Sequence, residues 1–127
     1  MIRRSILVGL LGVAALGASV APVAANDADI ITRGNCSGAT DWKLKLSPED
    51  GKIEVEFEVD QNRNGRVWQV VIKQNGTKVW QGSRTTRAPS GSFEVRIVRP
   101  NRAGPDQFVA RATNVNSGEV CRGVATF

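Results

Sequence analysis

Apolar and polar residues alternate along several stretches of this chain, and this period of two constrains the fold more than any other feature. In the clearest stretch, Ile53, Val55, Phe57 and Val59 alternate with three glutamates. The same alternation occurs in WKLKL (42–46), WQVVIK (68–73), SFEVRIV (92–98) and QFVARAT (107–113). Because successive side chains of a β-strand point to opposite faces, each stretch predicts a strand with one buried and one exposed face.

Turn-forming residues separate these stretches, at 47–51, 64–65, 75–76, 88–91, 100–105 and 116–118. They are rich in Gly, Pro, Asn, Asp and Ser, which favour tight turns. With one further strand around each cysteine, the chain has seven or eight short strands. That number and spacing are typical of an immunoglobulin-like sandwich. The sequence therefore predicts an all-β protein, a single immunoglobulin-like antiparallel β-sandwich of about seven strands.

The N-terminal segment has the features of a secretory signal peptide. Paired arginines at positions 3 and 4 precede an uncharged apolar stretch, and Val23-Ala24-Ala25 fits a signal peptidase site. The alternative is a membrane-spanning helix, but the stretch is shorter than the roughly 20 residues that a span needs. The motif around the arginines is incomplete, which favours general secretion over twin-arginine export.

These features divide the chain into three parts. We expect a signal peptide over 1–25 that is cleaved, a flexible leader over 26–32 and the sandwich domain over 33–127. The protein is then secreted, with no membrane span after cleavage.

The chain has two cysteines, Cys36 and Cys121, near the two ends of the predicted domain. Outside the cytoplasm, two lone cysteines most simply form one disulfide. A zinc site is the alternative, but a chain without histidine and with two thiols offers few ligands for it. A bond that closes so long a loop stabilises a domain by about 4–5 kcal/mol in the chain-entropy treatment. We expect it to join the first strand to the last.

Three segments, DWKLKLSPEDGKIEVEFEVD, TTRAPSGSFEVR and SGEVCRG, resemble a group of small secreted actinobacterial proteins with a single-disulfide immunoglobulin-like domain. The resemblance covers essentially the whole mature chain. That group has no assigned activity, so the resemblance implies a fold and a location and assigns no catalytic residue. The chain differs from antibody domains, because its cysteines lie at the domain ends and it has no tyrosine for a tyrosine corner.

The absence of histidine excludes the usual serine and cysteine triads. Carboxylate catalysis would rest on the row Glu54, Glu56 and Glu58. However, Lys43 and Lys45 occupy the outer face of the preceding strand, and ion pairs across the two strands explain the same glutamates. We therefore expect no catalytic residue, no cofactor and no enzymatic activity.

The stretch DQNRNG (60–65) matches the opening of an EF-hand calcium loop. Val71 stands where that loop needs its glutamate, and Arg63 and Arg66 bring positive charge to the same segment. A polar turn between two strands explains these residues equally well. We predict no metal site.

Charge is distributed unevenly along the chain. Residues 26–76 contain seven basic and nine acidic residues, whereas residues 77–127 contain eight basic and three acidic ones. The arginines of the second half are Arg84, Arg87, Arg96, Arg99, Arg102, Arg111 and Arg122. A basic arginine face suits anionic partners such as wall polymers, polysaccharides or phospholipid headgroups. The alternative is a mixed-charge surface that only keeps the protein soluble.

Two places are candidate ligand-binding sites. If Asn75-Gly76 forms a two-residue hairpin, Trp80 lies beside Val71 and Lys78 on the polar face, as a stacking platform for a sugar or a partner side chain. The alternatives are a loop that covers Trp80, or a bulged turn that buries Trp80 instead of Val79. In the second place, Arg84 and Arg87 are candidate specificity residues of an exposed inhibitory loop.

We therefore expect a secreted, non-catalytic binding module of the cell surface or medium. Its partner would be an anionic cell-wall polymer, a glycan or another secreted protein; the chain has no recognisable nucleic-acid-binding motif. Two alternatives remain open: a secreted inhibitor or effector that acts through an arginine-rich loop, and a small carboxylate-dependent hydrolase.

Overall fold

The computed structural model describes residues 28–127. The predicted signal peptide and the first two residues of the predicted leader lie outside this range. Within it the chain forms eight strands: β2 (Ile30–Asn35), β3 (Asp41–Glu49), β4 (Lys52–Asp60), β5 (Val67–Gln74), β6 (Thr77–Thr85), β7 (Ser92–Pro100), β8 (Gln107–Asn114) and β9 (Val120–Thr126). In this part of the chain, no helix is long and apolar enough to cross a membrane.

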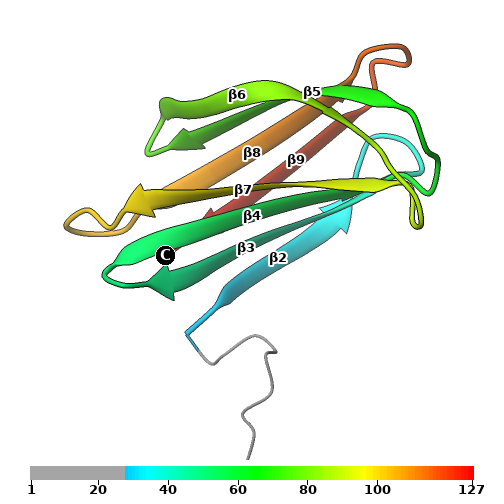
Figure 1. Cartoon of the computed structure of the whole chain (residues 1–127). Coiled ribbons are helices and arrows are strands. Elements are labelled where there is room, and N and C mark those ends of the chain that lie inside the picture. The colour runs from blue at the N-terminus through cyan, green and yellow to red at the C-terminus, as the bar shows by residue number, and fades with distance from the viewer. Residues whose placement is uncertain (1–27) are drawn as a thin grey trace, which may run out of the picture.

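The strands form two four-stranded antiparallel sheets, with the orders β2-β3-β4-β7 and β6-β5-β8-β9. The sheets lie face to face as two layers (Figure 1). The chain passes from the first sheet to the second after β4, returns after β6 and crosses again after β7. Hairpins joined by such crossovers are the arrangement of an immunoglobulin-like sandwich. The predicted fold class is confirmed, with eight strands in place of about seven.

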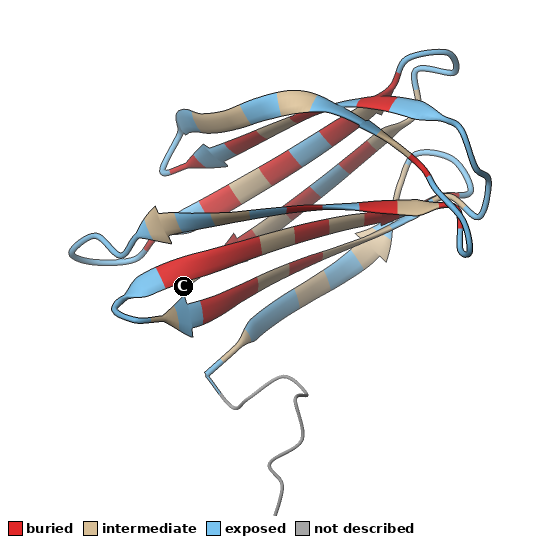
Figure 2. Cartoon of the chain, in the orientation of Figure 1, coloured by how far each residue is buried: buried red, intermediate tan, exposed pale blue. Residues whose placement is uncertain are grey.

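The core lies between the two sheets, and the alternation of the sequence produces it. Ile53, Val55, Phe57 and Val59 are all fully buried, as predicted from their period of two. In Figure 2 buried positions alternate with more exposed ones along the strands. Trp68 is also fully buried, and its indole Nε1 donates a hydrogen bond to Gln61 Oε1 at 3.0 Å. The ring therefore fills the core while its one polar atom keeps a partner.

The predicted leader ends too late in the sequence. β2 begins at Ile30, and it pairs with β3 from Ile30 opposite Leu46 to Asn35 opposite Asp41. Residues 30–32 therefore belong to the sheet and not to a flexible segment. This short strand lacks a clear alternation, so only its pairing with β3 reveals it.

The first predicted turn, at 47–51, is shorter than expected. β3 continues to Glu49, and only Asp50 and Gly51 form the turn, both with positive φ. Pro48 is tolerated inside β3 because β2 begins only at Ile30, opposite Leu46, and so does not reach position 48 on its side of β3. The hairpin thus has a two-residue turn with positive φ at both positions, as in a type I′ turn.

The disulfide joins Cys36 to Cys121, with a Cα–Cα distance of 4.2 Å. Cys36 directly follows β2 of one sheet, and Cys121 lies in β9 of the other sheet. The bond therefore connects the first strand to the last, as predicted, and it also connects the two sheets.

Glu119 holds the loop that follows Cys36. Its carboxylate accepts hydrogen bonds from Gly38 N at 2.9 Å, Thr40 N at 3.0 Å and Thr40 Oγ1 at 2.9 Å. Thr40 is buried. The loop between β2 and β3 is thus fixed to the start of β9 beside the disulfide.

Candidate anion-binding face

The two sheets differ sharply in charge. Strands β5, β6, β8 and β9, all within residues 28–127, contain no Asp or Glu. Strands β2, β3, β4 and β7 contain seven acidic residues: Asp41, Glu49, Glu54, Glu56, Glu58, Asp60 and Glu94. The sandwich therefore has one sheet with charges of both signs and one sheet whose charged side chains are all cationic. We call the first of these, β2-β3-β4-β7, the mixed sheet, with reference to its charge alone.

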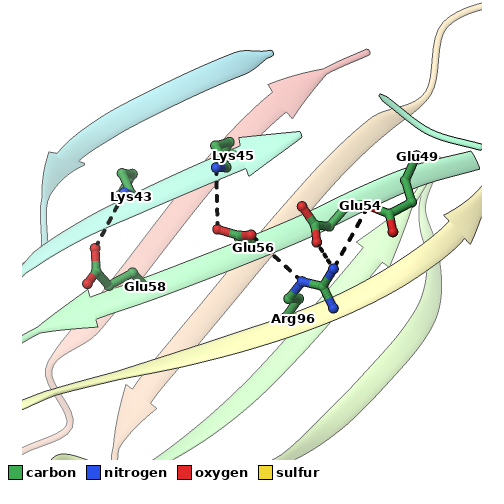
Figure 3. A network of polar contacts seen from close by, with 7 residues as sticks. All are labelled: Lys43, Lys45, Glu49, Glu54, Glu56, Glu58 and Arg96. Carbon is green, nitrogen blue, oxygen red and sulfur yellow. Dashed lines mark ion pairs between the residues drawn. The ribbon is translucent and has the colours of Figure 1, made fainter. Parts of the chain in front are cut away.

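Ion pairs cover the outer face of the mixed sheet (Figure 3). Lys43 Nζ lies 3.8 Å from Glu58 Oε1, and Lys45 Nζ lies 3.7 Å from Glu56 Oε1. From β7, Arg96 contacts Glu54 and lies 3.8 Å from Glu56 and 3.9 Å from Glu49. The predicted pairing of the two lysines with the glutamate row is confirmed, and Arg96 extends it to a third strand.

The outer face of the other sheet carries four exposed cations, Lys73, Lys78, Arg111 and Arg122. Period two places them there. In β5 the buried Val70 and Ile72 alternate with Val71 and Lys73, and in β8 Arg111 lies between the buried Ala110 and Ala112. We call this surface, defined by the four cations, the basic face.

The cations of the basic face lie opposite one another in pairs of like charge. Lys73 is the cross-strand partner of Lys78, and Arg111 is the partner of Arg122. No carboxylate within residues 28–127 forms an ion pair with any of the four. Like charges directly opposite each other destabilise a sheet, so the basic face keeps an unfavourable arrangement that a bound anion would relieve.

The basic face is slightly hollowed. A shallow depression, open to solvent, is lined by Val71, Lys73, Gly76, Lys78, Gln107, Val109, Arg111 and Arg122. Val71 and Val109 are half-buried between the cations. Lys78 Nζ also donates a hydrogen bond to Gln81 Oε1 at 2.6 Å, which holds its ammonium over the face.

The five predicted ligand-binding residues do not lie together. Val71 and Lys78 line the basic face. Trp80 and Arg84 lie on the core-facing side of β6, where the Arg84 guanidinium carbon is 4.8 Å from the indole centroid. Arg87 is exposed in the turn before β7.

The predicted platform of Trp80, Val71 and Lys78 is wrong. Asn75-Gly76 does form the two-residue turn, but the β5–β6 register shifts between Ile72 and Lys73, so Ile72 pairs with Trp80. Val79 is the extra residue of this bulge. One extra residue moves every later side chain of the strand to the other face. Trp80 and Val79 therefore both pack against the core, half-buried.

The turn that carries Arg87 is firmly held. Arg87 N donates to Ser92 O at 3.0 Å, and Gly91 O accepts hydrogen bonds from the backbone N–H groups of Gln61 and Asn62. Arg84 lies within strand β6, and its Nη1 donates to the carbonyl oxygen of Ser83. Of the two proposed specificity residues, only Arg87 lies in an exposed turn.

The EF-hand-like stretch forms an irregular connection between β4 and β5. Asp60 Oδ1 accepts a hydrogen bond from Asn62 N at 3.2 Å, which is a local turn contact. Val71 lies further along, within β5. Within residues 28–127, no three His, Cys, Asp or Glu side chains gather in a way that would hold a metal ion.

Three residues of the basic face, Lys73, Arg111 and Arg122, were not among the predicted site residues. Counting charge by halves of the chain obscured them, because consecutive strands of a sandwich change sheets. Arg96 lies in the ion-pair network of the mixed sheet, and Arg99 Nε donates to Gln74 Oε1 at the end of the core. The feature of the sequence that could have predicted the basic face is the complete absence of carboxylates from strands β5, β6, β8 and β9.

In comparisons with known proteins, no family model matches this chain, and no curated protein does either.

Proposed function

We propose that this protein is a secreted, non-catalytic binding module that binds anionic ligands through the basic face. One observation carries the proposal: Lys73, Lys78, Arg111 and Arg122 share one exposed sheet face without a carboxylate. On the other sheet, in contrast, Lys43, Lys45 and Arg96 form ion pairs with glutamates, and this difference supports a binding role for the unpaired cations of the basic face.

The rigid sheet favours recognition at this face. All four side chains start from paired strands, so their backbone positions are fixed before a ligand arrives. A cluster of one sign of charge raises the local concentration of oppositely charged ligands and speeds their association. Binding would also remove the repulsion within each like-charged pair.

Two features support a location outside the cytoplasm. The disulfide Cys36–Cys121 is of the kind that persists in oxidising compartments. The N-terminal sequence has the composition of a signal peptide.

The proposal is tested by titrating dextran sulfate into the protein, with uncharged dextran as the ligand control. Lys73→Gln/Arg111→Gln removes two positive charges from the basic face. Arg33→Gln/Lys52→Gln removes two exposed charges from the mixed sheet and is the matched control. Affinity should fall about tenfold or more in the first variant, which corresponds to a loss of about 1.4 kcal/mol.

The control variant should change affinity by less than about twofold, because charges beyond a Debye length of about 8–10 Å are largely screened. Equal losses in the two variants would mean that only net charge attracts the polymer. Unchanged affinity in both would remove the basic face from the function. Either result contradicts the proposal.

A further inference from the structure

The four cations of the basic face form a row that crosses all four strands of the sheet. In one line of cross-strand partners, Lys78 lies opposite Lys73, Lys73 opposite Val109 and Val109 opposite Val124. In the next line on the same face, Gln81 lies opposite Val71, Val71 opposite Arg111 and Arg111 opposite Arg122. The cations thus occupy β6 and β5 in one line and β8 and β9 in the next.

Sheet geometry fixes the spacing of this row. Directly opposite partners such as Lys73 and Lys78 have Cβ atoms about 5 Å apart, and the diagonal step from Lys73 to Arg111 is about 7–8 Å. Three strand spacings of about 4.8 Å and one step of about 6.7 Å along a strand give a row about 16 Å long. One small anion can contact one pair of cations, whereas only an extended ligand can contact all four.

The surroundings of the row are neutral. Gln69 and Thr113 lie opposite each other in the next line of the same face, and Ser83 lies beyond Gln69 on β6. Ser83 Oγ donates to Gln69 Oε1 at 3.2 Å. The apolar residues within the row, Val71 and Val109, are half-buried and line the floor of the depression. This surface offers charges in a line with hydrogen-bonding groups beside it, and the valines between the cations are half-buried.

We propose that the ligand is a linear polyanion that lies across the strands and places sulfate, phosphate or carboxylate groups of successive repeat units against the row. This inference rests on the proposed function, because it names the class of ligand for the same face. It adds that the order of the cations matters, and not only their number.

The experiment compares ligands of graded length. Inorganic phosphate, linear polyphosphates and heparin-derived oligosaccharides are titrated into the protein by calorimetry at several salt concentrations. Affinity should rise steeply with chain length until the ligand spans about 16 Å, the length of the row from strand geometry, and only slowly beyond it. For the long chains, four contacted cations predict a slope of log K against log salt of about −3. Polyphosphate and heparin fragments of equal charge show whether the repeat units contribute beyond their charge.

A charge-relocated variant separates the row from the mere charge of the face. Lys73→Gln/Gln69→Lys keeps the net charge and the face but moves one cation about 13 Å along β5, out of the row. Its affinity for long chains should fall toward that of short ones, and its salt slope should become about 0.7–1 less steep.

Three results would overturn the inference in distinguishable ways. If long chains bind the relocated variant as well as the unmodified protein, the row is refuted and the proposed function stands. If phosphatidylglycerol vesicles bind more tightly than polymers of equal charge, the ligand is a membrane surface; the row is again refuted and the proposed function stands. If no anionic probe binds, both proposals fail together.

Discussion

Gly123 of β9 lies directly against the indole ring of Trp42: a Cβ atom at position 123 would be 2.7 Å from Cζ3. Near another edge of the same ring, a Cβ at Gly34 of β2 would be 2.7 Å from Cζ2. The ring is thus held between two strands that belong to different sheets. Beside the disulfide, this contact fixes how β2 and β3 pack on β9.

We predict that Gly123→Ala lowers the free energy of unfolding by about 1–3 kcal/mol, because the ring packs against both Gly123 and Gly34 and leaves no room for an added methyl group. Thr126→Ala, on the exposed face of the same strand, should stay within about 0.5 kcal/mol. Urea unfolding measures both. In a double-mutant cycle, Trp42→Phe should recover part of the loss; strict additivity would show that the ring is not the obstacle.

Reduction of Cys36–Cys121 should destabilise the domain strongly. The bond spans a sequence separation of 85 residues. Its loss costs about 4–5 kcal/mol in the chain-entropy treatment, and each kcal/mol lowers the Tm of a domain of this size by several degrees. Differential scanning calorimetry with and without reductant should show a fall of about 20 °C or more. A fall of only a few degrees would mean that Glu119 and the sheet contacts hold the two ends without the bond.

Glu119→Ala should also be costly, because it removes the carboxylate that accepts hydrogen bonds from Gly38 N, Thr40 N and Thr40 Oγ1. A loss of about 1–3 kcal/mol is expected, because the backbone N–H of the buried Thr40 would be left without an acceptor. Glu58→Ala, the matched control, removes a partly exposed ion pair with Lys43 and should cost less than about 1 kcal/mol. Equal losses in chemical denaturation would contradict the role assigned to Glu119.

The strands and the disulfide follow from local sequence, whereas the basic face does not. The alternation from Ile53 to Val59 predicts β4 because burial on one face repeats every second residue. Likewise, the sequence predicts that the lysines of β3 pair with the glutamates of β4, because the short turn between the two strands fixes their register. Lys73 and Arg122, in contrast, share a face only because β5 and β9 flank β8, which local sequence does not encode.

The position of Trp80 depended on one inserted residue. Val79 and Trp80 are adjacent and both apolar, so the period of two in β6 could place either of them in the core. The shift between Ile72 and Lys73 accommodates both against the core. The contacts of the tryptophans with Gly34, Gly82 and Gly123 also could not be predicted from the sequence, because they depend on how strands and rings approach one another in space.

Lys73→Glu should stabilise the protein while it weakens binding. Opposite Lys78, a glutamate replaces a repulsive pair with an attractive one, and the free energy of unfolding should rise by about 0.2–1 kcal/mol. Lys45→Glu, opposite Glu56, should do the reverse and destabilise the mixed sheet. Thermal melts and dextran sulfate titrations of both variants check this. A Lys73→Glu protein that is less stable, or that binds as tightly as before, would argue against a face kept repulsive for its ligand.

The most direct measurement is a map of the backbone amide shifts of the ¹⁵N-labelled protein during titration with a heparin-derived oligosaccharide long enough to span the row. We expect the largest shifts at Lys73, Lys78, Arg111 and Arg122 and at the valines between them, and we expect these shifts to saturate together. If the strongest shifts lay on β3 and β4 of the mixed sheet, or around Arg84 and Arg87, the anion would bind elsewhere and the basic face would not be the binding site.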